Sequence, residues 1–250
     1  MDPVPVRWPA DSICLSTSSY DLPSLASTVY SRVCRVELSA PGFCLVKIEA
    51  SVSSQEFRRL MVDLKIAMSA VHEKSTGNML ICLSGLRADQ QNSTRLHLYG
   101  GPDESLLILG YEPSEVDSSI AVADYASSAA DLGMSPKAYM EQHNPIFQSE
   151  EELLRPYISG VPCFSPGAFQ ILVVNNSSAP FDHVAWQGAL HQATIPFPDE
   201  AKRRIIDSML IASAPPGSDD VVSPDEMREF MSTSSVRRRT YDRPDLDDDV

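Results

Sequence analysis

The stretch that decides the fold covers residues 169–214 and reads FQILVVNNSSAPFDHVAWQGALHQATIPFPDEAKRRIIDSMLIASA. It opens with an apolar, β-branched run at 171–174, which is typical of a buried strand. His191 follows in the segment ALHQAT, and the basic pair Arg203-Arg204 begins a second β-rich run. A histidine at one strand edge, followed on the next strand by arginine and serine, can hold a metal ion beside a carboxylate-bearing molecule. The same pattern also fits two core strands with a hydrogen-bonded histidine and solvated arginines.

The composition excludes several classes of partner. Of the 250 residues, 43% are hydrophobic and 22% are charged, as is usual for a soluble globular protein. The 20 basic and 34 acidic residues give a formal net charge of −14, which argues against nucleic-acid binding, because phosphate contacts need clustered Lys and Arg. No apolar run has the length of a membrane span, and the first residues lack a signal-peptide pattern. We therefore expect a cytoplasmic protein that binds a small molecule, with no nucleic acid or membrane as partner.

The cysteines agree with a reducing compartment. Their number is odd, they are widely spaced, and they form no CxxC motif. This pattern favours reduced thiols over a disulfide framework or a zinc site. The residues concerned are Cys14, Cys34, Cys44, Cys82 and Cys163.

The remaining chain reads as one helix among short strands. Ser53 and Glu56 form a capping box, and the apolar residues behind them recur at steps of three and four, which predicts an amphipathic helix. Strand patterns separated by Gly and Pro turns favour a β-sandwich or barrel over a sheet of βαβ units. The predicted strands cover residues 42–48, 78–86, 94–99, 106–111 and 120–123, in addition to those of the opening stretch.

The chain divides into a main domain with appendages. We expect an irregular N-terminal arm at 1–30 and a main domain at 31–214, which contains a helical insertion at 125–160 that lies over the site as a lid. A linker with a short helix follows at 215–231, where Ser223 caps the helix. The last segment, 232–250, is rich in charge and is expected to be a disordered acidic tail.

The segment 94–99, TRLHLY, alternates in character along its length. In an extended strand Leu96 and Leu98 face one side, whereas Arg95, His97 and Tyr99 face the other. An Arg, His and Tyr on one strand face can line a cavity, and they can equally face solvent.

His97 and His191 are the candidate metal ligands. They lie on strands far apart in sequence, and in a jelly roll such positions can converge at one mouth of the barrel. Two imidazoles and one carboxylate on one face form a ligand set for non-haem Fe(II). A guanidinium beyond the second histidine would pair with the distant carboxylate of a cosubstrate. Alternation along the last strand places Arg204 and Ser208 on one face, with Arg203 as the fallback on the other.

At this point the chain resembles the Fe(II)/2-oxoglutarate-dependent dioxygenases of the double-stranded β-helix fold. The resemblance covers about residues 40–214, in the segments GFCLVKI, RLHLYGG, ILVVNN, ALHQAT and RRIIDS. It implies a mainly β fold with helices (α+β), a jelly roll preceded by a helix. It also implies Fe(II) held by His97 and His191, and 2-oxoglutarate held by Arg204 and Ser208.

The first metal motif departs from this family. The family has His-x-Asp or His-x-Glu, whereas Tyr99 occupies the third position here. Asp103, with Glu104 beside it, is the candidate for the missing carboxylate, although a turn aspartate also bonds its own backbone. Tyr99, Arg95 and Asn175 are the candidate catalytic or substrate-contacting residues. Asn175 can equally close the turn after its strand.

Three functions remain open on this pattern. The first is an Fe(II)/2-oxoglutarate oxygenase acting on a small-molecule metabolite. The second is a non-oxidative isomerase or cyclase that uses Arg95, His97 and Tyr99 for acid–base work. The third is a metal-free binding protein on the same fold. The metal content of the protein separates the first from the other two.

Overall fold

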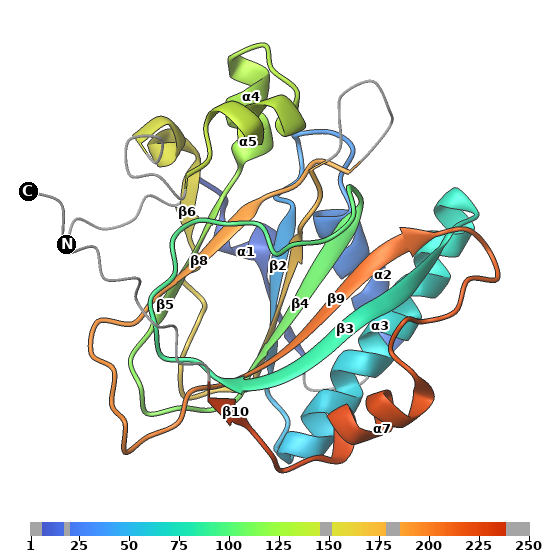
Figure 1. The fold of residues 1–250 in the computed structure, drawn as a ribbon, viewed down its shortest axis with the longest axis vertical. Coiled ribbons are helices and arrows are strands. Elements are labelled where there is room, and N and C mark those ends of the chain that lie inside the picture. The colour runs from blue at the N-terminus through green and yellow to red at the C-terminus, as the bar shows by residue number, and fades with distance from the viewer. Residues whose placement is uncertain (1–6, 18–20, 146–151, 179–185, 239–250) are drawn as a thin grey trace, which may run out of the picture.

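The computed structural model describes residues 7–17, 21–145, 152–178 and 186–238. Within these ranges the chain forms two sheets flanked by helices (Figure 1). The strands of the larger sheet are β1 (Cys14–Thr17), β2 (Phe43–Ile48), β3 (Met79–Asp89), β4 (Ser105–Tyr111), β7 (Gln170–Asn175), β9 (Ile205–Ala214) and β10 (Arg237–Arg238). The strands of the smaller sheet are β5 (Ser119–Ala123), β6 (Ile158–Gly160) and β8 (Leu190–Thr194). The helices are α1 (Ala10–Ile13), α2 (Leu22–Val33), α3 (Ser54–Thr76), α4 (Tyr125–Asp131), α5 (Pro136–Gln142), η1 (Arg155–Tyr157) and α7 (Pro224–Ser232).

The strand order is that of a jelly roll. The larger sheet runs β1-β2-β7-β4-β9-β3-β10, and the smaller one runs β6-β5-β8. Residues 93–97 lie antiparallel beside β8, where Thr94 N–H donates to Ala193 O and His97 pairs with His191. From β3 to β9 the chain therefore passes back and forth between two facing sheets, as jelly rolls do. The prediction of a mainly β jelly roll preceded by a helix is confirmed.

Two layers of apolar side chains lie against the two faces of the larger sheet. Alternate residues of β2, β4 and β7 point either toward helices α2 and α3 or toward the smaller sheet. The helix layer includes Phe57 and Met61 of α3, and the layer between the sheets includes Leu107, Leu109 and Tyr111 of β4. Because β2, β4 and β7 supply side chains to both layers, their sequences are nearly continuous apolar runs.

Helix α3 packs closely against β4 because of one glycine. The helix has the predicted capping box of Ser53 and Glu56. A Cβ atom on Gly110 of β4 would lie 2.8 Å from Cε1 of Phe57, so a larger residue here would displace side chains of the helix. No helix among the described residues is long and apolar enough to span a membrane.

The two ends of the chain are more ordered than their composition suggests. The expectation of an irregular arm at 1–30 is corrected, since α1, β1 and α2 fall in this range and β1 pairs in parallel with β2. Residues 1–6 and 18–20 lie outside the described residues. Within the predicted tail at 232–250, β10 pairs with the end of β3, where Arg237 lies opposite Ala88. The rest of that tail, 239–250, lies outside the described residues.

The helical insertion covers the outer face of the smaller sheet. Helices α4 and α5 and the turn η1 lie between β5 and β6, and residues 146–151 fall outside the described residues. The insertion buries Tyr125 and Tyr139 against Leu96 and Leu190. These two leucines neighbour His97 and His191 in sequence and point away from them, so the described part of the insertion backs the histidine strands. The expectation of a lid over the site is corrected accordingly.

Two of the cysteines are paired. Cys14 of β1 and Cys163, in the connection from β6 to β7, form a disulfide with their Cα atoms 6.4 Å apart. The prediction that all five thiols are reduced was therefore wrong, because the fold brings together two cysteines that are 149 residues apart. Cys34, Cys44 and Cys82 are free. Since structural disulfides persist in oxidising environments, the cysteine pattern no longer supports a cytoplasmic location.

A buried cluster of charges lies on the helix side of the larger sheet. Arg87 of β3 donates through Nη1 to Glu112 and, at 2.9 Å, to Oδ1 of Asp207. Burial raises the pKa of Asp207, which is fully buried, to about 7. Arg58 of α3 lies 3.4 Å from Glu112, and its guanidinium also donates to the carbonyl of Phe230 at the end of α7. The cluster thus ties β3, β9, α3 and α7 together.

We expect Arg87→Met to lower the free energy of unfolding by roughly 3–5 kcal/mol, because it leaves two buried carboxylates without their shared cation. Arg203→Met is the matched control, since Arg203 is exposed, and should change stability by no more than about 0.5 kcal/mol. Urea unfolding of both variants measures the difference. Equal losses in the two variants would contradict a stabilising role for the cluster.

The disulfide makes a prediction about accessible thiols. When the protein is unfolded without reductant, a thiol reagent should titrate the three free cysteines, and after reduction it should titrate all five. A Cys14→Ser, Cys163→Ser double variant should give the same thiol count with and without reductant. Five reactive thiols in the unreduced protein would show that the pair does not form.

Candidate functional site

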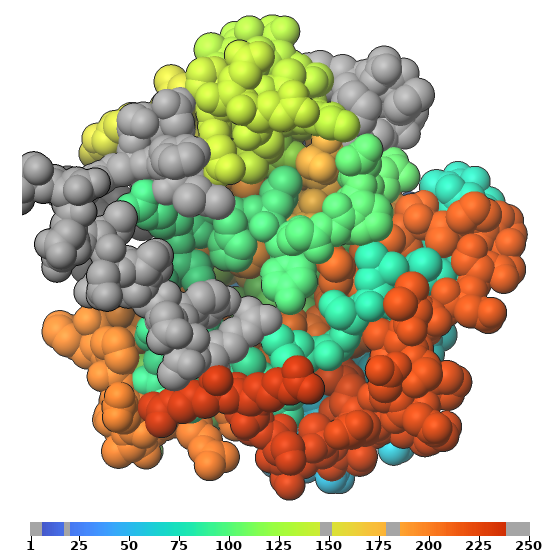
Figure 2. All heavy atoms as spheres, in the orientation of Figure 1, coloured from blue at the N-terminus to red at the C-terminus, as the bar shows by residue number. Residues whose placement is uncertain are grey.

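A cavity of about 80 Å³ lies between the two sheets, on the side of β3 and β9. Figure 2 shows this face of the molecule, which is hollowed near its centre beside the green segment that follows β3. Leucines, alanines and isoleucine from β3, β4, β8 and β9 form its apolar walls. The polar and aromatic side chains that line it are Gln90, Thr94, His97, Tyr99, Tyr111, His191, Arg204 and Ser208.

The two candidate metal ligands meet in this cavity. The backbones of His97 and His191 exchange two N–H···O hydrogen bonds of 3.2 Å, and their rings lie 4.3 Å apart between centroids. Directly opposed residues of antiparallel strands place their side chains on the same face, so the pairing itself brings the imidazoles together. The structure therefore places the two histidines side by side although they are far apart in sequence.

The two imidazoles differ in their surroundings. Nδ1 of His97 lies 2.7 Å from the backbone oxygen of Arg95, so Nδ1 is the donor in this hydrogen bond and Nε2 is directed elsewhere. His191 is buried, and its Nδ1 has no hydrogen-bond partner among the described residues. Burial, with a contribution from neighbouring His97, lowers the pKa of His191 to about 3, so its imidazole is neutral at ordinary pH. The neutral imidazole of His191 can serve as a ligand without first losing a proton.

Arg204 presents a buried cation to the same cavity. Its Nε donates to Oγ of Ser118 at 3.1 Å and its Nη1 to the backbone oxygen of Gln90 at 2.9 Å, which fixes the guanidinium. The guanidinium lies over the ring of Tyr111, with Cζ 5.4 Å from the ring centroid. Nη2 is buried without a hydrogen-bond partner in the described part of the chain. An unsatisfied, buried N–H donor of this kind suits the oxygen of an anionic ligand.

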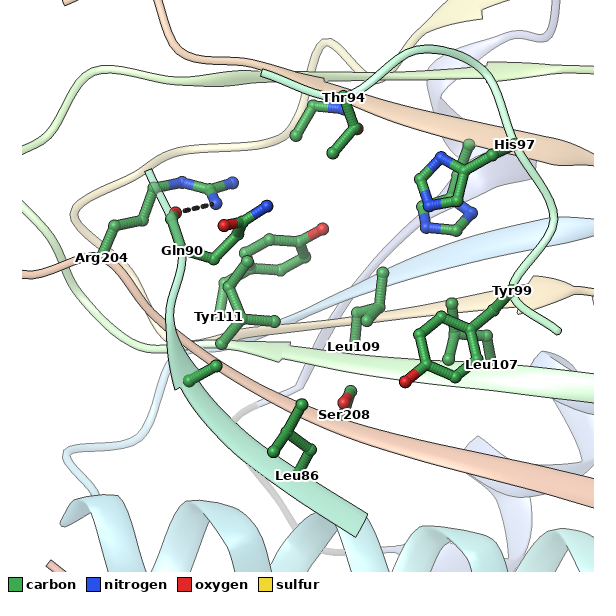
Figure 3. Close-up of a pocket in the computed structure, with 14 residues that line it drawn as sticks. Leu86, Gln90, Thr94, His97, Tyr99, Leu107, Leu109, Tyr111, Arg204 and Ser208 are labelled. Atoms are coloured by element: carbon green, nitrogen blue, oxygen red, sulfur yellow. Dashed lines mark hydrogen bonds between the residues drawn. The ribbon is translucent and has the colours of Figure 1, made fainter. Parts of the chain in front are cut away.

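The histidine pair and Arg204 lie at opposite ends of the cavity. In Figure 3 Arg204 lies at one end and His97 at the other, with Gln90 and Tyr111 between them. Ser208 follows Arg204 along the same face of β9, whereas Asp207 between them points into the charge cluster. A ligand that reaches both ends would therefore need an anionic group at one end and metal-binding atoms at the other.

Tyr99 lines the cavity near the histidines, and its backbone is tightly fixed. The side-chain amide of Asn176 accepts a hydrogen bond from Tyr99 N–H and donates one to Tyr99 O, both at 2.7 Å. The hydroxyl of Tyr99 points toward Ser208 and away from the ring of His97 (Figure 3). Tyr99 thus narrows the cavity. The dioxygenases that the sequence resembles have a carboxylate at this position of the first metal motif.

The structure does not bring the other candidate residues to the cavity. Asp103 lies in the turn before β4, where its backbone oxygen accepts from Ser178 N–H, and Glu104 accepts from Trp186 N–H. Arg95 is exposed and does not line the cavity, whereas His97 and Tyr99 of the same predicted strand face do. Asn175 is buried, where its Oδ1 accepts from Ser177 N–H within the turn and its Nδ2 donates to Val33 O at the end of α2. In the described ranges no three His, Cys, Asp or Glu side chains form a group suited to a metal ion.

Several residues of the site were missed at the sequence level. Gln90, Thr94 and Tyr111 line the cavity, and Asn176 holds Tyr99 in place. Tyr111 carried a signal, since it alternates with Leu107 and Leu109 on the inward face of β4. The other three lie outside regular strands or at their ends, where periodicity does not indicate a direction.

Comparison with known proteins does not identify the function of this chain. No protein-family model matches the chain, and no curated protein matches it. Among solved structures, the chain overlaps with the iron and alpha-ketoglutarate-dependent endoperoxidase NvfI at a TM-score of 0.33 and 14% identity, over 73% of this chain and 82% of that one. It also overlaps with HygX from Streptomyces hygroscopicus with nickel and 2-oxoglutarate bound, at a TM-score of 0.37 and 12% identity, over 84% and 94%. Overlaps with such low scores carry no argument about function.

The low pKa of His191 predicts how stability depends on pH. The unfolded chain takes up a proton at this residue near pH 6.5, whereas the folded chain does so near pH 3. The unfolded state therefore binds more protons between these values, and lowering the pH destabilises the fold. In His191→Gln, the stability lost between about pH 7 and about pH 5 should be smaller than in the parent protein. Urea unfolding at both pH values measures this, and equal losses would contradict the assignment.

Proposed function

We propose that this chain is a non-haem Fe(II)/2-oxoglutarate-dependent oxygenase that acts on a small-molecule metabolite. The observation that supports this most is the convergence of His97, His191 and Arg204, from three separate segments, on one cavity inside a jelly roll. Two imidazoles and a buried guanidinium have little reason to share a cavity unless a metal ion and an anion bind there together.

The residues that line the cavity provide most of the contacts that Fe(II) and 2-oxoglutarate require. His97 and His191 would hold Fe(II) through their imidazoles, and the unpartnered Nη2 of Arg204, with the hydroxyl of Ser208, would hold a carboxylate of 2-oxoglutarate. Bound together, Fe(II) and 2-oxoglutarate supply the activation of O₂ needed to oxidise a substrate. A third protein ligand is not provided by the described residues.

The walls of the cavity set the conditions for that chemistry. Leu107 and Leu109 of β4 and Ile206 of β9 are apolar, which keeps bulk water from the anion and strengthens its pairing with Arg204. At about 80 Å³ the cavity is well below the roughly 300–1,000 Å³ of common ligand pockets, so a substrate would lie at its mouth. The net charge of −14 favours a metabolite over a nucleic acid.

The absence of a carboxylate ligand for the metal favours a second candidate function. The protein would then be a non-oxidative isomerase or cyclase, or a metal-free binding protein. Tyr99 occupies the place of that ligand, and its phenol with the imidazole of His97 can donate and accept protons at a bound molecule. In this case Arg204 would still bind an anionic ligand, but the protein would retain no iron.

We expect the protein to bind Fe(II) and 2-oxoglutarate together and to show a visible charge-transfer band without oxygen. His191→Ala should abolish the band, because it removes one of two ligands. His143→Ala is the matched control, since His143 packs on Tyr139 in the insertion and does not line the cavity, and it should leave the band unchanged. A parent protein that binds 2-oxoglutarate but never iron would instead support the second candidate.

A further inference from the structure

We propose that the outer edge of β3 is a docking site for an extended, basic peptide segment of a partner protein, which binds by adding a strand to the larger sheet. The inference goes beyond the proposed function, because the groove concerned lies beside α7 and requires neither a metal ion nor a cosubstrate. It is carried by an uncovered stretch of strand edge, by the groove beside that stretch and by the charges along the groove.

The outer edge of β3 lacks a neighbouring strand over part of its length. β9 pairs with β3 on one side along the whole strand, whereas on the other side β10 pairs only with its last two residues. Further back, the backbone oxygen of Cys82 accepts hydrogen bonds from the N–H groups of residues 221 and 222. Residues 83–86 lie between these two covered points, and Ser84 and Gly85 are exposed. Such an edge presents backbone N–H and C=O groups with which an extended chain can pair.

A groove of about 400 Å³ lies beside this stretch, between β3 and α7. In the register of β10, residues 233–236 would continue along residues 84–87, but they form no strand there. Figure 1 shows α7 and β10 beside the same edge of β3. The volume falls within the roughly 300–1,000 Å³ of common ligand sites. The apolar residues that line the groove are Leu83, Leu86, Val221, Val222, Met227 and Phe230.

The surroundings of the edge favour a single extended chain over a second copy of this protein. Residues 221–222 lie at one end of the stretch and β10 at the other. A whole sheet would have to pass both, whereas one strand needs a width of only about 4.8 Å. The described end of the chain also leads away from the groove, because β10 runs parallel to β3 and Arg238 already lies opposite Asp89, the last residue of β3.

One side chain in the groove has an unused hydrogen-bond donor. Arg87 lines the groove and is 8% exposed, and its Nε has no hydrogen-bond partner in the described part of the chain. Its two terminal nitrogens already donate to the carboxylates of Glu112 and Asp207, which compensate the charge of the guanidinium. Nε therefore suits a neutral acceptor, such as the backbone carbonyl of a peptide, better than a second anion.

The charges along the groove favour a basic peptide. Glu226 and Glu229 of α7 both line it and are exposed. Glu226 also caps its own helix through Ser223, so we assign Glu229 to the cation of the peptide. Arg237 lines the opposite end beside β10, so the cationic side chain should lie at the α7 end. The net charge of −14 adds a long-range attraction for a basic segment.

The test measures the binding of a fluorescein-labelled pentapeptide, Val-Lys-Val-Lys-Val with an amidated C-terminus, to the full-length protein by fluorescence anisotropy. Its valines should contact Met227 and Phe230, and its lysines supply the positive charge. The matched ligand control, Val-Glu-Val-Glu-Val, has the same length and strand preference and should bind about tenfold or more weakly, because like charges oppose its approach.

Backbone pairing has a signature that attraction between side chains lacks. In an added strand, alternate amides of the peptide point toward the edge. N-methylation of one alternating set should therefore abolish binding, whereas N-methylation of the other set should change the affinity by no more than about twofold. In amide hydrogen exchange, those amides of residues 83–86 that face away from β9 should exchange fast in the free protein and slowly with the peptide bound.

Two pairs of variants locate the site on the protein. Ser235→Trp fills the groove and should abolish binding, whereas Ser234→Trp, at an exposed neighbour outside the lining, should not. Glu229→Lys should weaken binding by about fivefold, the scale of an exposed ion pair that is lost. Glu141→Lys, at an exposed position of α5, makes the same change of net charge elsewhere and should have little effect. Circular dichroism verifies that all four variants are folded.

Several results would overturn the inference. They include no binding of the basic peptide, equal binding of the two peptides, equal losses from both N-methylated sets and unchanged affinity in Ser235→Trp. Slow exchange at the outward amides of residues 83–86 in the free protein would also overturn it. A second copy would then cover the edge if the protection rises with protein concentration, and the chain's own residues would cover it if the protection is constant. Metal binding in the cavity is measured separately, so the proposed function is unaffected by any of these results.

Discussion

The pair of backbone hydrogen bonds between His97 and His191 is the constraint on which the site depends. These bonds of 3.2 Å attach segment 93–97 to β8 and thereby complete the smaller sheet of the jelly roll. Because directly opposed residues share a face, the same pairing turns both imidazoles inward and turns Leu96 and Leu190 outward to the helical insertion. A slip of one residue in this register would exchange the two faces and remove the site.

Strand β9 couples the stability of the fold to the composition of the site. Arg204 and Ser208 face the cavity, while Asp207 faces Arg87 in the buried charge cluster on the other side of the sheet. The cluster requires Asp207 to point toward α3, and alternation then requires Arg204 and Ser208 to point the other way. Tyr111 of β4 completes this arrangement beneath the guanidinium. The position of the candidate anion site is therefore set by the packing of the larger sheet.

The sequence contained most of the fold because its strands and helix α3 are strongly periodic and their ends carry clear caps and turns. It also pointed to His97, His191 and Arg204, since each lies on or beside a recognisable strand. It left open whether Arg95 faces a cavity or solvent and whether Asp103 stays in its turn, because strand periodicity decides neither. The pairing of Cys14 with Cys163 was equally hidden, as it depends on the position of β1 at the sheet edge.

The proposed function requires that two imidazoles and one guanidinium form a single site for a metal ion and an anion. Pulsed electron paramagnetic resonance of the protein loaded with Mn²⁺ and 2-oxoglutarate tests it directly, because the spectrum counts the nitrogen ligands of the metal. The spectrum should show couplings from two imidazole nitrogens, one of which is lost in His97→Ala and the other in His191→Ala. A loaded protein without nitrogen couplings would contradict it.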